Sequence, residues 1–453
     1  MAGAHGCSRS GCAMGLPSRT TMAKFQSPTG MHDLLGEDLE YFRKIENVCR
    51  DIADFYGFQR IETPILEETE LFEKGTGFTT DIVQKQMFSF RTRGGDFLTL
   101  RPEGTPGIVR SYIQQGMQNL PKPVKLWYFG PFFRYERPQA QRFRQFYQFG
   151  FESLGVEKPV IDAQIIKIFY NILKELGFKD LTIELNSIGD SECRPEYKRI
   201  LVKYLRSHQS NLCPDCRRRL RENPLRILDC KRERCQIIAG AAPQMIDRLC
   251  KECHNHFKSV LEFLEELELP YQLNPYLVRG LDYYTKTVFE IFPGSLKDDK
   301  KSSQEIDKTA LVGGGRYDDL VKLLRGKDTP ACGAAAGVER IVYLMKLKGR
   351  KMPSPKLPQV FLAQVGELPK RKSLKIFEEF RINKIKVAEA FHKDSLISQL
   401  RMADGLAVKF VLILGQKEAL EEKIIIREMK TGKQKIIPIK NVIKEVKRRL
   451  KKD

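Results

Sequence analysis

The chain has 453 residues, and its 42% hydrophobic content is enough for about three domains with cores of their own, which excludes a disordered protein. Its 78 Lys and Arg outnumber its 57 Asp and Glu, so an anionic partner is expected. The most apolar run, VKFVLILG at 408–415, is far shorter than the roughly 18–20 residues of a membrane span, so we expect a soluble protein with no membrane partner.

The first 21 residues differ from the rest of the chain. They are small, rich in Ser and Gly and free of acids, and Met22 opens a more ordinary sequence. We interpret residues 1–21 as a disordered leader or an upstream start, with an organelle transit peptide as the alternative. The 11 cysteines follow no recognisable signal peptide, which predicts free thiols in a reducing compartment, the cytoplasm.

Helix and strand patterns alternate over residues 22–189. Apolar residues at helical spacing predict a long helix over 38–58, followed by a strand over 59–72 that bends near Pro64. A long helix that feeds a strand in this way fits a dimer-forming element. Further strands are predicted at 97–104, 125–136, 143–155 and 181–189, with a helix at 162–178.

Residues 190–256 change character, because they are rich in Arg and Cys and poor in strand patterns, and we predict an insertion. Strand patterns resume at 271–293 and 310–321. The chain then enters a helix with an apolar face, formed by Val338, Ile341, Val342 and Met345.

Prolines and basic residues mark 348–357 as a linker. Beyond it, β-like and α-like runs alternate and predict a small α/β domain over 358–453. Residues 351–453 hold 25 Lys and Arg against 12 Asp and Glu, an excess of 13 positive charges. A polyanion is the expected partner of this end, and a solvated, solubility-promoting surface is the alternative.

Arginines cluster in a predicted hairpin, FRYERPQAQRFRQFYQFGFE at 133–152. The pattern places Arg134 and Glu136 on one face of a strand, reverses through Pro138 to Arg142, and returns with Gln148 and Glu152. Guanidinium groups offer planar, bidentate donors to phosphate oxygens, so the hairpin suits a bound polyphosphate. Arg340, in GVERI, stands at the start of a helix. Each arginine taken alone fits a surface salt bridge equally well.

The segment RGLDYYTKTVFE at 279–290 places an arginine, an acid and two tyrosines beside the β-branched residues of a predicted strand. Tyrosines that pack on arginine stems in a sheet would explain it without any function. The segments around it favour another interpretation.

These motifs together resemble a known family. The helix and strand at 38–66, the hairpin, and GAAAGVERI resemble motifs 1, 2 and 3 of class II aminoacyl-tRNA synthetases. LTLRPEGT at 98–105, RGLDYYTKTVFE and GGGRYDDLV at 313–321 are similar to signature segments of histidyl-tRNA synthetases. The resemblance runs from about Gln26 to the C-terminus.

The resemblance implies roles for the arginines. Arg279 would be catalytic and would point at the α-phosphate of ATP and the attacking carboxylate of histidine, where a fixed guanidinium stabilises developing charge. Arg134 would share the α-phosphate. The ATP-binding set would be Arg134, Glu136, Arg142, Phe146 and Arg340, with Phe146 stacked on adenine.

The same resemblance implies a histidine pocket. Acceptor oxygens would bind the α-ammonium group, while Glu152 and Tyr284 would hydrogen-bond the imidazole, a polar device that rejects analogues lacking those groups. The glycines at 313–315 would let the backbone approach substrate. The implied histidine-binding residues are Glu103, Gly104, Thr105, Gln148, Glu152, Tyr283, Tyr284 and Tyr317.

Cysteine pairs in the insertion leave two interpretations open. CPDC at 213–216, CKRERC at 230–235 and CKEC at 250–253, which is followed by His254 and His256, are spaced as zinc ligands are. Four thiolates from the two CxxC pairs would close a tetrahedral structural site, whereas the alternative is reduced thiols without metal. We assign no metal ligand to the chemistry itself.

The resemblance implies an α+β protein: an antiparallel-sheet catalytic core at 22–189 and 257–347 with a helical insertion at 190–256, and an anticodon-binding domain at 358–453. It implies a homodimer that joins L-histidine to tRNA(His) with ATP and Mg²⁺. The alternative is a non-catalytic regulatory or tRNA-sensing relative. Relatives of that kind typically lose parts of the RGLDYY segment and lack the C-terminal domain, whereas this chain keeps both.

Overall fold

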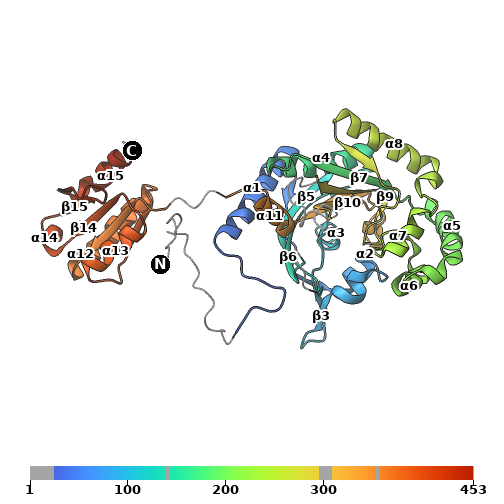
Figure 1. Ribbon diagram of the computed structural model, residues 1–453, viewed down its shortest axis with the longest axis horizontal. Helices are drawn as coiled ribbons and strands as arrows, with labels where there is room; N and C mark the ends of the chain where they lie inside the picture. The colour runs from blue at the N-terminus through green and yellow to red at the C-terminus, as the bar shows by residue number, and fades with distance from the viewer. Residues whose placement is uncertain (1–24, 138–141, 295–308, 353–356, 452–453) are drawn as a thin grey trace, which may run out of the picture. The chain divides into compact units, whose positions relative to one another are not determined.

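The computed structural model describes residues 25–137, 142–294, 309–352 and 357–451. The chain divides after Met352 into two compact units, which are described separately (Figure 1). The predicted leader at 1–21, the reversal through Pro138 and the middle of the predicted linker lie outside the described residues.

The N-terminal unit is built on a mainly antiparallel sheet. The strand order is β1-β5-β6-β11-β10-β9-β7-β8, and only the pairs β1–β5 and β7–β8 are parallel. In that order the strands are Gln59–Arg60, Val124–Phe133, Gln145–Leu154, Ala331–Gly337, Val312–Arg316, Thr285–Pro293, Leu181–Ser187 and Tyr271–Leu273.

A second sheet and several helices complete this unit. The small sheet has the order β2-β4-β3, with β2 at Leu66–Glu68, β4 at Phe97–Leu100 and β3 at Phe88–Arg91. The helices are α1 (Glu37–Tyr56), α2 (Thr69–Thr76), η1 (Ile82–Gln86), α3 (Thr105–Gln114), η2 (Met117–Asn119), α4 (Pro159–Glu175), α10 (Leu320–Leu323) and α11 (Val338–Leu347).

Side chains along the central strands alternate between the two faces of the large sheet, so core residues and polar residues lie on opposite faces. In β6, Phe149 and Phe151 pack against α1, α4 and α11, whereas Gln148 and Glu152 point to the other face. The helices contribute apolar stripes to this core, and α1 ends at Gly57, whose φ of 73° is a left-handed conformation that glycine adopts without strain. One face of the sheet is therefore filled by α1, α4 and α11, and the other carries polar side chains such as Gln148 and Glu152 beside a second core that includes α3.

Residues 190–266 form a helical layer (Figure 1). Its elements are α5 (Cys193–Ser207), η3 (Gln209–Asn211), α6 (Pro214–Glu222), η4 (Pro224–Ile227), α7 (Glu233–Gly240), η5 (Ile246–Arg248) and α8 (Lys251–Glu266). The helical character of the predicted insertion is confirmed, but α8 continues beyond residue 256 and packs its later turns into the main core through Phe257, Val260 and Leu264.

Three strand predictions need correction. The predicted strand at 59–72 is split between β1 and β2, which belong to different sheets, and α2 begins at Thr69. The predicted strand at 271–293 is interrupted over 274–284, where Pro275 and Gly280 disfavour a continuous ladder. Strand β5 ends at Phe133, so Arg134 and Glu136 follow the strand instead of sharing one of its faces.

The C-terminal unit is a small α/β domain, as predicted. Its sheet has the order β13-β12-β14-β15-β16, with β13, β12 and β14 parallel and the last two strands antiparallel. The sequence patterns missed β13 and β16. The elements are β12 (Val360–Gln364), α12 (Glu367–Ile382), β13 (Val387–Glu389), α13 (Leu396–Gly405), β14 (Phe410–Leu414), α14 (Gln416–Leu420), β15 (Lys423–Glu428), β16 (Gln434–Pro438), η6 (Ile439–Asn441) and α15 (Val442–Leu450).

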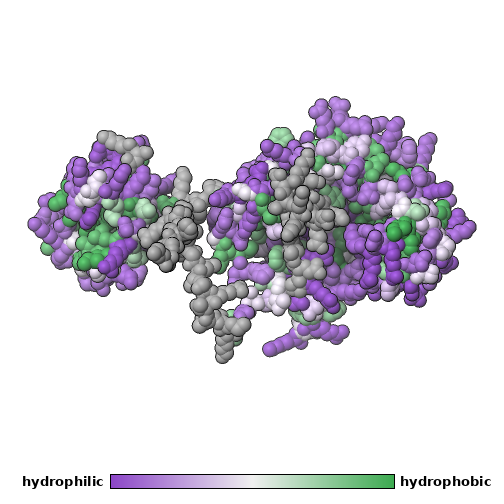
Figure 2. Space-filling model, viewed as in Figure 1, coloured by the Kyte–Doolittle hydropathy of each residue, from purple (hydrophilic) through white to green (hydrophobic). Residues whose placement is uncertain are grey.

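Hydrophilic side chains cover much of the visible face of each unit (Figure 2). Among the described residues, no helix combines the length and the apolar character that crossing a bilayer requires.

Candidate active site

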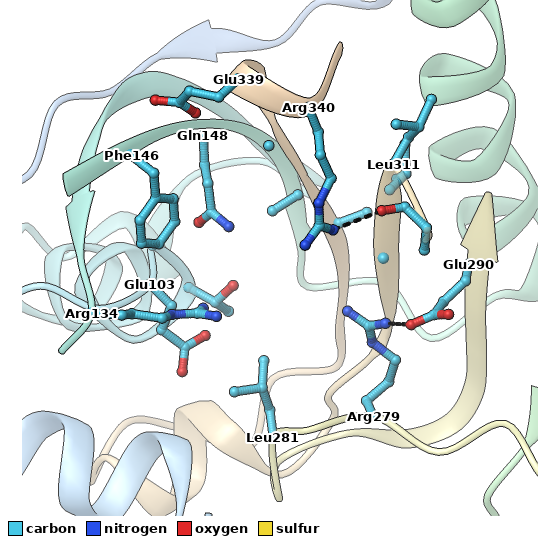
Figure 3. Close-up of a pocket in the computed structure, with 18 of the residues that line it drawn as sticks. Glu103, Arg134, Phe146, Gln148, Arg279, Leu281, Glu290, Leu311, Glu339 and Arg340 are labelled. Carbon is cyan, nitrogen blue, oxygen red and sulfur yellow. Dashed lines mark hydrogen bonds and ion pairs between the residues drawn. The ribbon is translucent and has the colours of Figure 1, made fainter. Parts of the chain in front are cut away.

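A pocket of about 320 Å³ opens on the face of the large sheet opposite to α1, α4 and α11. Its walls come from β6, β9, β10 and β11, from the residues that follow β4 and β5, from the 279–284 segment and from the start of α11. Figure 3 shows Glu103, Gln148 and Phe146 on one wall and Arg279 with Glu290 on the opposite wall, with the side chain of Arg340 extending between them.

Glu103 is a buried carboxylate at one end of the pocket. It accepts a hydrogen bond from the Thr76 hydroxyl, and the Tyr283 hydroxyl donates to its Oε2 at 2.8 Å. Burial raises its pKa, while the two donors and the charges of Arg134 and Arg279 partly offset that effect. The result is a preorganised acceptor suited to a cationic group.

Glu152 lies beneath the pocket in a second buried network. Thr105 donates to its Oε1 at 2.8 Å and Tyr317 to its Oε2 at 2.6 Å. Burial raises its pKa to about 8 against these two donors, so at neutral pH this carboxyl can either donate or accept a proton. A Cβ at Gly333, on the neighbouring strand, would lie 1.6 Å from Glu152 Oε2, so only glycine leaves room for this side chain.

Aromatic hydroxyls surround the two carboxylates. The rings of Tyr283 and Tyr284 lie 4.7 Å apart, and burial raises the pKa of both, which keeps their hydroxyls as donors. Tyr128, which the sequence reasoning missed, fills the space beside Gly104 and Gly150, where an added Cβ would approach its ring to 2.5 and 2.4 Å. These small residues are therefore needed to accommodate the ring.

Arginines line several sides of the pocket, and Arg134 lies on the same wall as Glu103 (Figure 3). Arg134 donates to the carbonyl oxygen of Pro102 at 2.9 Å and lies 5.4 Å from the centre of the Phe146 ring. Arg340 donates to the carbonyl oxygen of Ala310 at 2.9 Å, and its pKa is lowered by burial and by the charges of Arg142 and Arg134. The mutual repulsion of these cations favours a bound anion.

Arg279 projects from the irregular 279–284 segment into the same region. Its guanidinium pairs with Glu290 on β9, a residue that the sequence reasoning missed (Figure 3). Glu290 stands opposite Gly313 in the sheet, and a Cβ at Gly313 would lie 2.1 Å from the Arg279 guanidinium. This cross-strand arrangement was invisible in the sequence, because it depends on the register of β9 and β10.

The helical layer holds the 279–284 segment in place. Asn223 donates to Asp282 at 2.8 Å, and Arg226 donates to the carbonyl oxygen of Gly280 at 2.9 Å. On the other side, Thr79 donates to Asp282 at 2.6 Å. The position of Arg279 therefore depends on residues that are distant in the sequence.

The structure brings the predicted site residues together. Glu152 and Tyr317 lie beneath the pocket and connect to it through Thr105. The predicted residues that line the pocket are Glu103, Gly104, Thr105, Arg134, Glu136, Arg142, Phe146, Gln148, Arg279, Tyr283, Tyr284 and Arg340.

Residues 30–341 match the family model of histidyl-tRNA synthetase, and residues 359–449 match that of an anticodon binding domain. The chain belongs to the histidyl-tRNA synthetase family. A histidine–tRNA ligase of Dehalococcoides mccartyi is 44% identical over 94% of this chain and 100% of its own length. One from Caldicellulosiruptor saccharolyticus is 41% identical, again over 94% of this chain and 100% of its own length.

The structural comparison agrees with this membership. Apo histidyl-tRNA synthetase from S. aureus superimposes with a TM-score of 0.75 at 34% identity, covering 93% of this chain and 99% of that one. The predicted class II fold, with an antiparallel-sheet catalytic domain and a C-terminal anticodon-binding domain, is confirmed for this histidyl-tRNA synthetase family member.

Proposed function

We propose that the protein is a histidine–tRNA ligase that activates L-histidine with ATP and transfers the histidyl group to the 3′ end of tRNA(His). The observation that carries this proposal is one pocket in which buried, hydrogen-bonded carboxylates face a group of arginines, in a chain similar over its whole length to histidine–tRNA ligases. A non-catalytic regulatory or tRNA-sensing role would not require this complete set.

In the first step, the carboxylate of histidine attacks the α-phosphorus of ATP, and the bond to pyrophosphate breaks. Two anions must approach each other, so the step needs fixed positive charge. Arg279 and Arg134 supply it from opposite walls (Figure 3). Arg142 and Arg340 bind the outer phosphates, Phe146 stacks on adenine, and Glu136 orients Arg142, with which it pairs at 3.6 Å.

The histidine substrate is recognised in the part of the pocket that contains Glu103 and Glu152. Glu103, Thr105 and Gln148 hold the α-ammonium group, and Gly104, which also lines the pocket, leaves room for the Tyr128 ring beside them. Glu152 binds the imidazole together with Tyr284, while Tyr283 and Tyr317 fix the two carboxylates. Because the Glu152 pKa of about 8 lies close to neutrality, this carboxyl can exchange a proton with an imidazole nitrogen.

ATP would bind as its Mg²⁺ complex. Magnesium keeps most of its ligands from phosphate and water and needs only one or two protein carboxylates. Glu136, Glu290 and Glu339 line the pocket and fit this requirement. Burial raises the pKa of Glu339 to about 7, and a nearby divalent cation would favour its ionised form.

The test is histidine-dependent exchange of pyrophosphate into ATP, followed by charging of total tRNA. We expect exchange with L-histidine and none with the other standard amino acids, and we expect charging of tRNA(His) alone. The proposed activity would be overturned by pyrophosphate exchange that does not depend on histidine. It would also be overturned if the folded protein showed no exchange at all.

The C-terminal unit is proposed to bind the anticodon loop, whose unstacked bases expose edges that a duplex hides. Removing residues 358–453 should abolish charging and leave adenylate formation, because every residue assigned to ATP or histidine lies before position 346. The affinity for tRNA should fall steeply with salt in the full chain and less steeply after truncation. This role would be overturned if the full and truncated chains bound tRNA with equal affinity and equal salt dependence.

We further propose a cytoplasmic homodimer that uses the helix and strands at 37–68 as part of its interface. Sedimentation of the full and truncated chains tests this assembly. It also separates a loss of tRNA contacts from a loss of dimerisation in the truncation experiment.

A further inference from the structure

Two groups of metal-ligating side chains lie within the helical layer. The first, called cluster A, is formed by Cys213, Cys216, Cys230 and Cys235, all four of them buried. The second, called cluster B, is formed by Asp190, Cys193, Cys250 and Cys253. In each cluster one ligand atom from every residue lies within 4.8 Å of the others. Neither cluster contains a residue assigned to catalysis.

This grouping corrects the sequence-based expectation. The two CxxC pairs were expected to share one site, but each belongs to a different cluster and finds its partners elsewhere. His256 contacts Asp162 at 3.4 Å and belongs to neither cluster. The sequence motifs therefore included six of the cysteines that converge, but they gave the wrong pairing and did not include Asp190 or Cys193.

The two CxxC pairs have the same local geometry. Cys213 caps the N-terminus of α6 and Cys250 caps the N-terminus of α8, and each sulfur accepts a hydrogen bond at 3.4 Å from the backbone N–H of the second cysteine. Backbone donors and the positive end of a helix dipole both stabilise a thiolate. The two CxxC pairs therefore present their sulfurs in the same way, each pair at the start of a helix.

Further backbone donors orient the other sulfurs. The N–H of Cys213 donates to Cys235 Sγ at 3.3 Å, and the N–H of Cys250 donates to Cys193 Sγ at 3.0 Å. In cluster B, Asp190 Oδ2 lies 3.0 Å from Cys253 Sγ. Contacts of this kind around the ligands orient them and tune a metal site.

The spacing of the sulfurs distinguishes a metal from a disulfide. A disulfide bond is about 2.05 Å long, whereas Cys213 Sγ and Cys230 Sγ are 4.0 Å apart. Tetrahedral Zn–S bonds of about 2.3 Å place ligand sulfurs about 3.8 Å from one another. Soft thiolate ligands with little or no oxygen select zinc over magnesium or calcium.

We propose that the helical layer binds two structural Zn²⁺ ions, one in cluster A through four cysteines and one in cluster B through three cysteines and Asp190. Both sites are closed, with four protein ligands each, which is the arrangement of structural zinc. The ions connect segments that are far apart in the sequence: cluster A joins α6 to α7, and cluster B joins the start of α5 to the start of α8.

The proposed ions also support the 279–284 segment. Cluster A fixes α6 and η4, from which Asn223 and Arg226 hold Asp282 and Gly280. Cluster B fixes the start of α5, from which Arg194 donates to the carbonyl oxygen of Tyr284. The metals are thus placed to position Arg279 without touching substrate.

The test is metal analysis of the full chain, expressed with added zinc and purified without chelator. We expect about two equivalents of zinc per chain. Cys216→Ser and Cys253→Ser should each retain about one equivalent, and the double variant should retain none. Cys49→Ala removes a buried thiol that belongs to neither cluster, and Cys7→Ser with Cys12→Ser removes the N-terminal thiols. Both controls should keep two equivalents.

Metal-free wild-type protein would overturn the proposal. Retention of both ions by Cys216→Ser would overturn cluster A, and retention of both by Cys253→Ser would overturn cluster B. If a serine variant fails to fold, wild-type protein loaded with Co²⁺ alone provides the second measurement. Tetrahedral thiolate coordination gives intense visible d–d bands with sulfur-to-metal charge transfer, whereas octahedral oxygen coordination, which lacks both, would overturn the proposal.

Discussion

The two ends of the active-site pocket balance their charges in different ways. At the histidine end, Glu103 and Glu152 are buried and their oxygens are already hydrogen-bonded to side chains of the protein. At the nucleotide end, Arg134 and Arg340 donate to backbone carbonyl oxygens, and burial together with the charges of Arg142 and Arg134 lowers the pKa of Arg340. The histidine end is complete in the free protein. At the nucleotide end, Arg279 and Arg142 pair with Glu290 and Glu136, and the phosphates of ATP would add further negative charge.

This contrast indicates that the histidine end selects the amino acid, whereas the nucleotide end stabilises the charge of the reaction. A hydrogen-bonded network that is rigid before binding discriminates among amino acids, since a wrong side chain leaves buried groups unsatisfied. A group of cations held by the fold stabilises charge that develops only during the reaction. Substitutions at the two ends should therefore change different kinetic constants.

The largest expected effect comes from Arg279→Ala. Adenylate formation should slow by about 100-fold or more, because one preorganised charge donor is lost from the transition state. The KM for histidine should stay nearly unchanged. Pyrophosphate exchange under saturating histidine and ATP measures the first effect, and a histidine titration measures the second.

Two variants control this prediction. Arg279→Lys keeps the positive charge but loses the planar guanidinium group. Its exchange rate should therefore lie between those of wild type and Arg279→Ala. Arg93→Ala removes an exposed arginine outside the pocket and should leave exchange unchanged. An Arg279→Ala protein that exchanges pyrophosphate at the parental rate would rule out a catalytic role.

Gly313→Ala tests the position of Arg279 without removing it. The new methyl group would occupy the place of the guanidinium and push it aside. Exchange should slow by about 10- to 100-fold, as expected for a misplaced catalytic group. Gly405→Ala, where a Cβ meets nothing within 4 Å, is the matched control and should behave as wild type. A rate for Gly313→Ala equal to that of the control would contradict this reading of the geometry.

Glu152→Gln tests the histidine end. Loss of a buried carboxyl that can exchange a proton with the imidazole should raise the KM for histidine by about tenfold, because a buried partner left unsatisfied costs roughly 1–3 kcal/mol. The KM for ATP should not change, since the carboxyl is assigned to no phosphate. Steady-state exchange with each substrate varied in turn checks both, and an unchanged histidine KM would exclude the assigned role.

The smallest expected effect is on stability against pH. The folded protein keeps a proton on Glu152 up to about pH 8, whereas the usual carboxyl pKa is 4.5. Between these values the folded state binds more protons than the unfolded state, so its stability falls as pH rises. A glutamine at position 152 does not titrate, so Glu152→Gln lacks this pH dependence of stability.

The Tm of Glu152→Gln relative to wild type should therefore increase between about pH 5 and about pH 8, by roughly 2–5 °C. Thermal unfolding of both proteins without substrates measures the difference. A difference that stays constant with pH would show that burial does not shift this carboxyl.

Local patterns predicted most of the fold and most of the pocket. Regular alternation and helical spacing located β6, β7, α1 and α4, and the signature segments identified the side chains that meet in the pocket. The failures were non-local. The 279–284 segment leaves the sheet because Asn223, Arg226 and Thr79 hold it, and they lie far from it in the sequence.

Pairing between distant segments explains the other misses. Glu290 and Tyr128 become part of the site only through the register of neighbouring strands and the space left by glycines. The cysteine motifs were visible, but which pairs converge depends on how α5, α6, α7 and α8 pack. Short strands such as β13 carry too few residues for a pattern to stand out.

Helix α8 limits how this enzyme can be rearranged by protein engineers. Its first turn carries Cys250 and Cys253, while Phe257, Val260 and Leu264 farther along belong to the main core. A cut at residue 256, where the sequence pattern changes, would divide one continuous helix between two fragments. The helical layer is therefore not an exchangeable cassette with a free boundary, and a viable graft or deletion would have to keep α8 whole.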